Sequence, residues 1–124
     1  MEIIRGFDDE YRRGDLDAIF HRYHPEIEVR DWFGGVHKGR DAAMESPRQW
    51  LRQWEWFSSE VEEIIDLDDD RVVLISRFRG KGEASGAETE WTAGEIWTFR
   101  DGKIAAIIGF PNVEAALEAA GLQG

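Results

Sequence analysis

The second half of the chain constrains the fold most, because its pattern predicts four β-strands in succession. Each segment is rich in Val, Ile, Thr, Phe or Trp, the residues that fit a pleated, half-buried surface. Turn-forming residues separate the segments, namely the Asp68–Asp70 run, the Gly80–Gly86 loop and the Asp101-Gly102 pair. Short connections of this kind predict an antiparallel meander. The four segments are residues 56–67, 71–81, 88–99 and 103–110.

The first half of the chain shows helical spacing instead. Ile4, Phe7 and Tyr11 lie three and four residues apart, which predicts an amphipathic helix over residues 2–13. Gly14 should end this helix, and the following Asp15 is a favourable N-cap for a second one. The second helix is expected to carry Leu16, Ile19, Phe20 and Tyr23 and to end at His24-Pro25.

Residues 27–33 (IEVRDWF) form the next predicted element, a strand that Gly34-Gly35 ends. A third helix is expected over about residues 40–54. Pro47 lies inside this helix and should kink it or split it in two, because proline lacks the backbone N–H that the helix interior needs.

The last predicted element is a helix over residues 113–120, capped by Asn112 and ended by Gly121. Helices first and strands later are typical of an α+β fold, with the helices gathered on one face of an antiparallel sheet. A chain of 124 residues without repeats or linkers predicts a single domain, residues 1–124.

Composition narrows the possible partners and chemistry. The formal net charge is −11 and no run of Lys or Arg forms a basic stripe, so neither nucleic acid nor an anionic membrane is expected as a partner. There is no apolar run of 18 residues, and acids occupy the N-terminal segment where a signal peptide is basic and then apolar, which predicts a cytoplasmic protein. Without cysteine, chemistry depends on carboxylates, imidazoles, hydroxyls and indoles.

Five short motifs carry a resemblance to a known family. They are YRRGDLDA (residues 11–18), YHPEIEVR (23–30), KGRDA (38–42), WTFRDGKI (97–104) and EAALEA (114–119). In order and spacing they resemble a SnoaL-like member of the nuclear transport factor 2 and ketosteroid isomerase superfamily, over essentially the whole chain. That superfamily contains isomerases, hydratases, cyclases, epoxide hydrolases and non-catalytic binders, so the resemblance bears on the fold more than on any one activity.

The resemblance implies a cone-shaped α+β fold, in which a strongly curved mixed or antiparallel sheet wraps around the N-terminal helix and further helices close an apolar pocket. The implied ligand is a small apolar or aromatic molecule of carbonyl type, and a homodimer through the outer face of the sheet is expected. Aromatic side chains are the expected pocket walls. They are Phe7, Trp50, Trp54, Phe57, Trp97 and Phe110.

Two acids lie on otherwise apolar strand faces. Asp31 shares a face with Ile27, Val29 and Phe33 by the two-residue period of a strand. In ketosteroid isomerases the general base lies 17 residues past the motif glycine, which here is again Asp31. A second isomerase acid, held protonated, lies four residues before the last aromatic residue of the penultimate strand, which corresponds to Glu95.

Such a pair of acids suits proton transfer that needs neither metal nor cofactor. Burial keeps one carboxyl protonated while the other remains a base, so Asp31 would take a proton α to a carbonyl and Glu95 would donate a hydrogen bond to the resulting oxyanion. The tyrosine donor of the isomerases is replaced here by Phe7, and Tyr11, one turn further along, is the expected auxiliary donor.

Both acids also fit structural roles. Asp31 could instead cap loop amides or pair with Arg30, Arg40 or Arg77, and Glu95 could pair with an arginine across the sheet, as expected of a non-catalytic binding module or dimeric scaffold. Two other reactions of the superfamily find less support in the sequence. Epoxide hydrolysis would need an arginine between the acids, and strand parity places Arg77 on the opposite face. Polyketide cyclisation would need an acid near the end of the last strand, where Ile108-Gly109-Phe110 offers none.

The histidines are given structural interpretations. His21 and His24 are three residues apart, but a metal site there is not expected. His37 is interpreted as an exposed loop residue.

Overall fold

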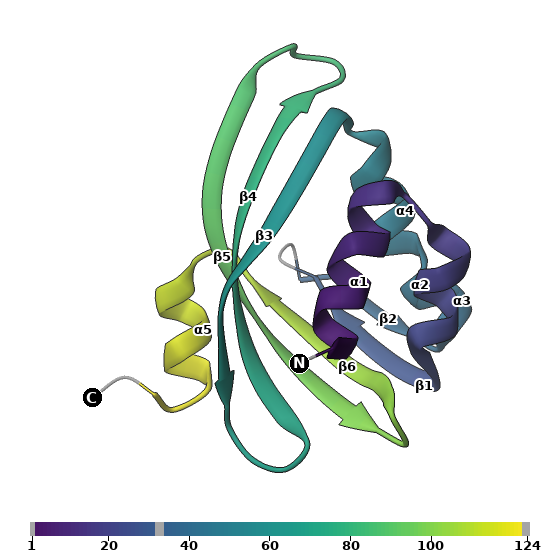
Figure 1. Ribbon diagram of the computed structural model, residues 1–124, viewed down its shortest axis with the longest axis vertical. Helices are drawn as coiled ribbons and strands as arrows, with labels where there is room; N and C mark the ends of the chain where they lie inside the picture. Colours follow the sequence, from purple (N-terminus) through teal and green to yellow (C-terminus); the bar gives the residue numbers. More distant parts are fainter. Residues whose placement is uncertain (1, 32–33, 123–124) are drawn as a thin grey trace.

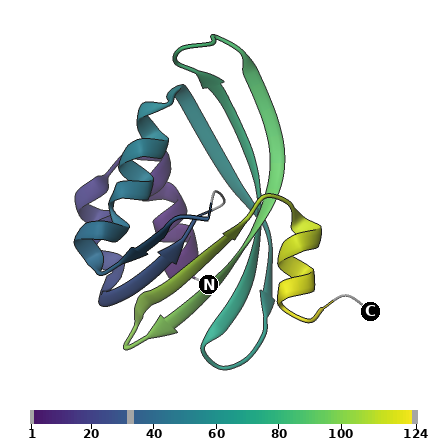
Figure 2. The same cartoon turned by 180° about the vertical axis from the view of Figure 1, so that it is seen from behind.

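The structure is a computed structural model that describes residues 2–31 and 34–122. Within these residues one six-stranded sheet has the order β2-β1-β6-β5-β4-β3. The sheet curves strongly around α1, which gives the cone expected from the resemblance, while α5 lies alone on the opposite face (Figures 1 and 2). The elements are α1 (Glu2–Arg13), α2 (Leu16–Arg22), β1 (Tyr23–Arg30), β2 (Val36–Lys38), α3 (Arg40–Ala43), α4 (Glu45–Arg52), β3 (Trp54–Asp66), β4 (Arg71–Gly82), β5 (Glu88–Arg100), β6 (Lys103–Phe110) and α5 (Val113–Ala119).

The predicted antiparallel meander is confirmed in β3 to β6. One cross-strand row runs from Leu74 on β4 through Glu95 on β5 to Gly109 on β6. The strand β1 was predicted, but its pairing was not: β1 lies parallel to β6, and the unpredicted three-residue β2 pairs antiparallel with β1. The sheet is therefore mixed, one of the two forms that the resemblance implied. β1 ends at Arg30, before Asp31, and Phe33 lies outside the described residues.

The two N-terminal helices begin and end close to their predicted positions. Asp15 caps α2 as expected, because its carboxylate accepts a hydrogen bond from the Ala18 amide. The Nε–H of Arg22 on α2 is shared between the two carboxylate oxygens of the buried Glu10 of α1, at 2.7 and 2.9 Å. A Cβ at Gly6 would lie 2.4 Å from the Arg22 guanidinium, so the absence of a side chain at Gly6 makes room for this pair.

The third predicted helix is split, as the proline indicated. α3 ends at Ala43, and α4 begins at Glu45, which places Pro47 in the first turn of α4. In a first turn the missing N–H of proline has no helical acceptor to lose, so the second helix starts just before the proline rather than kinking at it.

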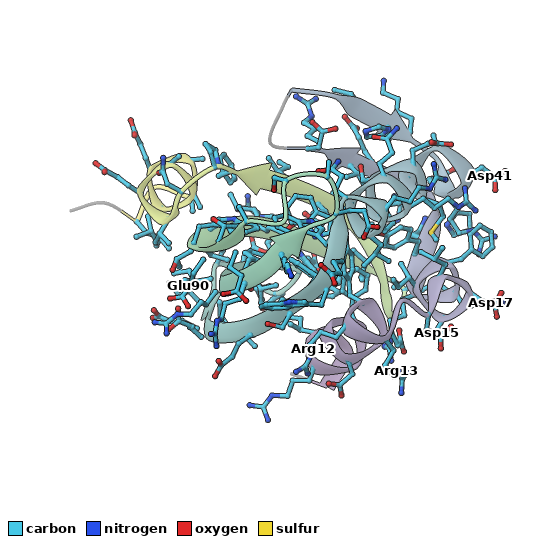
Figure 3. The ribbon with its side chains drawn as sticks, turned by 90° about the horizontal axis from the view of Figure 1, so that it is seen from above. Arg12, Arg13, Asp15, Asp17, Asp41 and Glu90 are labelled. Carbon is cyan, nitrogen blue, oxygen red and sulfur yellow. The ribbon has the colours of Figure 1, made fainter. Side chains whose placement is uncertain are left out.

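The period of the strands divides the apolar residues between two cores. Val72 and Leu74 of β4 face α1 in the larger core, whereas Val73 and Ile75 of the same strand face α5. The last helix packs closely there, since a Cβ at Gly94 would lie 2.5 Å from that of Ala116. Charged side chains project outward. Figure 3 labels six of them at the periphery, namely Arg12, Arg13, Asp15, Asp17, Asp41 and Glu90.

Candidate functional site

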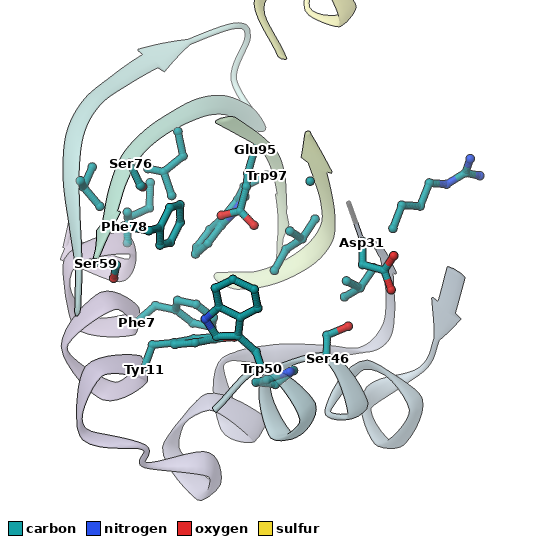
Figure 4. A pocket seen from close by; sticks show the side chains of 18 of the residues that line it. Phe7, Tyr11, Asp31, Ser46, Trp50, Ser59, Ser76, Phe78, Glu95 and Trp97 are labelled. Carbon is teal, nitrogen blue, oxygen red and sulfur yellow. The ribbon is translucent and has the colours of Figure 1, made fainter. Parts of the chain in front are cut away.

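A cavity of about 170 Å³ lies between the inner face of the sheet and the helices. Three elements supply most of the side chains that give it chemical character. α1 contributes Phe7 and Tyr11, β5 contributes Glu95 and Trp97, and α4 contributes Ser46 and Trp50 (Figure 4). The lining is mainly aromatic and aliphatic with a few polar groups, which is typical of small-molecule sites.

Glu95 is the acid of the cavity wall. The two-residue period of β5 turns Glu95 inward with the buried Ala93 and Trp97. The Trp97 indole N–H donates to Glu95 Oε1 at 3.3 Å. Burial raises the pKa of Glu95 to about 7, and the indole hydrogen bond opposes this shift only in part. Among the described residues no arginine or lysine forms an ion pair with Glu95, so no such partner favours its ionised form.

Two tyrosines lie close enough to Glu95 to interact with it electrostatically. Burial raises the pKa of Tyr11 well above its ordinary value, and Tyr23 and Glu95 raise it further. Burial and the charge of Glu95 likewise raise the pKa of Tyr23. Both phenols therefore stay protonated at neutral pH and keep an O–H donor. Phe7 does not take part in this donor set and packs edge-on against Trp97, with ring centroids 4.9 Å apart.

Asp31 lines the same cavity from its rim and is held differently. The Gly35 amide donates to Oδ1 at 2.8 Å, and His37 Nε2 lies 3.0 Å from Oδ2. In Figure 4 the carboxylate points away from Glu95. The structure therefore shows the loop-capping arrangement, with a histidine as partner where an arginine was expected, and His37 belongs to β2 rather than to an exposed loop.

The remaining predicted wall residues divide into two groups. Trp50 lines the cavity, whereas Trp54 and Phe57 pack behind it, with ring centroids 5.3 and 5.4 Å from that of Trp50. The expectation for Phe110 is wrong. Phe110 is the cross-strand partner of Gly94 and packs beneath α5 in the smaller core, because cross-strand partners share one face of a sheet.

Sequence reasoning missed the polar face that α4 turns to the cavity. Ser46, Gln49 and Gln53 line the cavity together with Trp50. Residues 46, 49, 50 and 53 are three, one and three positions apart, which places them on one side of a helix. This spacing could have predicted the polar face from the sequence. Ser46 Oγ is buried and has no hydrogen-bond partner among the described residues. Ser59 and Ser76, which were not singled out either, line the cavity from β3 and β4.

Two other kinds of site find no support in this geometry. Arg77, which epoxide hydrolysis would need between the acids, pairs with Glu62 at 3.3 Å on the face of β4 opposite to Ser76. Within residues 2–31 and 34–122, no group of three or more His, Asp or Glu side chains is arranged to hold a metal ion.

In the same part of the chain, no helix is long and apolar enough to span a bilayer.

The curved sheet, the enclosed α1 and the cavity between them define a protein with the nuclear transport factor 2 and ketosteroid isomerase-like fold. The chain belongs to the SnoaL-like domain family, whose model matches residues 4–107. No protein of curated function matches the chain.

Solved structures share this fold at low sequence identity. A hypothetical protein with a ketosteroid isomerase-like fold from Catenulispora acidiphila, in complex with trimethylamine, has a TM-score of 0.81 at 13% identity, over 98% of this chain and 94% of that one. A protein named as a SnoaL-like polyketide cyclase from Jannaschia sp. gives 0.80 at 17%, over 99% and 92%. TerC, co-crystallised with polyporic acid, gives 0.77 at 21%, over 97% and 96%. At these identities the likeness extends to the fold alone.

Proposed function

We propose that the cavity binds a small apolar or aromatic ligand with a carbonyl-type oxygen, and that Glu95 is the acid that acts on this oxygen. One observation carries the proposal: a carboxyl that has no ionic partner in the described part of the chain lies in a largely aromatic cavity, with its pKa raised to about 7. A neutral carboxyl donates a hydrogen bond to a carbonyl, and it does so most effectively to the negative oxygen that forms after proton abstraction.

The surroundings of Glu95 support this role. Tyr11 and Tyr23 keep their protons because burial raises both pKa values, so they add O–H donors close to the carboxyl rather than charges. Aromatic walls exclude water and strengthen such hydrogen bonds. The cavity of about 170 Å³ is close to the roughly 150 Å³ that holds one benzene ring, so the expected ligand has a single ring rather than a steroid skeleton.

Asp31 is the proposed base, together with His37. Asp31 lines the cavity, and His37 Nε2 lies 3.0 Å from its Oδ2, so the carboxylate and the imidazole form a hydrogen-bonded pair at the cavity rim. In an unconjugated cyclic enone the proton would leave the α-carbon between the carbonyl and the double bond and return to the γ-carbon, the far end of the original double bond, so that the double bond moves into conjugation with the carbonyl. Glu95 would hold the dienolate oxygen meanwhile.

A non-catalytic binding module is the second candidate. The observation that favours it is the orientation of Asp31, whose carboxylate points away from Glu95 and is held by the loop. In this reading Glu95 fixes the orientation of the ligand, and Asp31 only shapes the rim.

A homodimer is proposed through the part of the outer sheet face that α5 does not cover. This part carries the 42% exposed Trp56 and, next to it, a basic row on β4 in which Arg77 and Arg79 pair with acids of the neighbouring strands. Sedimentation of the wild type and of Trp56→Glu tests the proposal. We expect a dimer for the wild type and a monomer for the variant, and a monomeric wild type would refute it.

Calorimetric titration with cyclohex-2-enone, from about pH 5 to about pH 9, tests the role of Glu95. A protonated carboxyl donates to the ketone and an ionised one cannot, so we expect the affinity to fall about tenfold as the pH rises through about 7. Glu95→Gln should bind with a flat profile, because glutamine keeps a donor at every pH. Glu88→Gln, an exposed change on the same strand, should retain the wild-type profile. An absence of binding, or the same profile in Glu95→Gln, would refute the proposal.

Isomerisation of cyclohex-3-enone to cyclohex-2-enone, followed by ultraviolet absorbance, separates the two candidates. Turnover that Asp31→Asn abolishes while enone binding persists would support the enzyme. Binding without turnover or exchange of the α-protons would support the module.

A further inference from the structure

α4 presents the cavity with a hydrogen-bonding face that the proposed role of Glu95 does not use. Ser46, Gln49 and Gln53 line it together with Trp50. We propose that Ser46 is a second anchor of the site, and that the ligand is an uncharged single-ring compound with two oxygen functions, one bound by Glu95 and the other by Ser46. The inference rests on the proposed function, because it takes Glu95 as the first anchor.

The hydroxyl of Ser46 provides the first argument. Ser46 Oγ is buried, lines the cavity and has no hydrogen-bond partner among the described residues. Buried polar groups in folded proteins are nearly always hydrogen-bonded, because a buried hydroxyl without a partner has lost its bonds to water. A ligand oxygen that reaches Ser46 would satisfy this hydroxyl.

The positions of the two anchors provide the second argument. Figure 4 shows Ser46 on α4 and Glu95 on β5 at different walls of the cavity, with the Trp50 indole beside Ser46 on α4 and below Glu95 in this view. A flat ring packed against this indole would therefore direct one substituent to the carboxyl and another to the hydroxyl. Apolar walls with a few separated polar groups fix the orientation of a ligand in this way.

Charge and size restrict the ligand class further. Two acids, Glu95 and Asp31, line the cavity, and the chain carries a formal net charge of −11. Arg30 is the one cation among the described lining residues, but its side chain is 58% exposed and pairs with Glu28 at 3.2 Å. An anionic ligand would thus meet repulsion without a compensating cation. A cavity of about 170 Å³ leaves room for one ring with small substituents.

Calorimetry with a matched set of ligands tests the inference. The set is acetophenone, its 3-hydroxy and 4-hydroxy derivatives, and 4-hydroxybenzoate as the anionic analogue. We expect the wild type to bind at least one hydroxyacetophenone about tenfold more tightly than acetophenone, which is the effect of one additional hydrogen bond. We also expect it to bind 4-hydroxybenzoate more weakly than acetophenone and more weakly than that hydroxyacetophenone.

Variants at Ser46 identify the source of this preference. Ser46→Ala should bind acetophenone as wild type does and lose the preference for the hydroxylated ligand, whereas Ser46→Thr, which keeps a hydroxyl, should retain it. Ser58→Ala is the matched control, because Ser58 precedes the cavity-lining Ser59 on β3 and faces the other way. If Ser46 had only a structural role, Ser46→Ala would lower the affinity for all ligands equally and leave the preference for the hydroxylated ligand unchanged.

The outcomes distinguish this inference from the proposed function. If acetophenone binds with the pH dependence assigned to Glu95 but neither hydroxyl derivative binds more tightly, the second anchor is refuted and the role of Glu95 stands. The second anchor is also refuted if the preference survives in Ser46→Ala, or if 4-hydroxybenzoate binds as well as the neutral ligands. If no compound binds, both proposals fail.

Discussion

Glu95 and Asp31 share one sequence pattern and have opposite environments. Each acid follows the apolar face of a strand, and each lines the same cavity. Glu95 lies in the middle of β5, where burial raises its pKa to about 7 and an indole N–H is its hydrogen-bond donor. Asp31 lies just past the end of β1, where a loop amide and a histidine hold its carboxylate.

The difference shows that position along the strand decides the chemistry of an acid on an apolar face. In mid-strand the neighbouring backbone amides are used by the sheet ladder, so a carboxyl there has few donors and becomes easier to protonate. At a strand end the turn supplies backbone amides that can donate to a carboxylate, as the Gly35 amide does to Asp31. The same residue type is thus a buried hydrogen-bond donor when protonated at Glu95 and a carboxylate held by a loop amide and a histidine at Asp31.

The largest expected effect concerns the stability that Glu95 confers below neutral pH. Its folded pKa, about 7, lies above the ordinary value of 4.5, so this contribution is complete below about pH 4.5 and is lost as the pH rises through about 7. The loss should reach about 3 kcal/mol. Urea unfolding across this range should show it for the wild type relative to Glu95→Gln, which cannot ionise. The exposed change Glu88→Gln should follow the wild type, and equal slopes for all three proteins would contradict the prediction.

An intermediate effect is expected at the rim. Asp31→Ala removes the acceptors of the Gly35 amide and of His37 and should cost about 1–2 kcal/mol. Gly35→Ala should cost a similar amount, because the new Cβ would lie 2.5 Å from Asp31 Oδ2 and displace the same carboxylate. Since both changes disrupt one contact, the double variant should be less destabilised than the sum, as measured by urea unfolding. Additive costs would argue against the contact, and a change in the pH dependence assigned to Glu95 would show that the two acids are coupled.

The smallest expected effect concerns the hydrogen bond that the Trp97 indole donates to Glu95. The Trp97 indole N–H lowers the pKa of Glu95, so Trp97→Phe should raise that pKa further. The carboxyl carbon resonance of Glu95, followed by NMR during a pH titration, measures the change. Trp56→Phe, which alters an indole that is 42% exposed on the outer side of the sheet, is the control. A midpoint that falls or stays constant in Trp97→Phe would contradict the assignment of the donor.

Local patterns sufficed for the features that depend on neighbours in sequence. The first helix, the Asp15 cap, the strand meander and the division of the third helix near Pro47 were all predicted, because spacing, capping and proline act within a few residues. β2 was missed, since three residues carry too little pattern to indicate a strand. The parallel pairing of β1 with β6 joins segments about 80 residues apart and has no local signature.

The sequence by itself determined that the chain has an α+β fold, that Glu95 faces inward and that aromatic side chains accompany it, because strand parity and helical period follow from the order of residues. The tertiary structure decided which environment each acid receives. Only folding places the Gly35 amide and His37 against Asp31, buries Glu95 beside two protonated tyrosines, turns Phe110 toward α5 and aims Ser46 at the cavity. Burial and hydrogen-bond partners are properties of the assembled sheet and helices, and they set the pKa values and the unsatisfied groups on which binding depends.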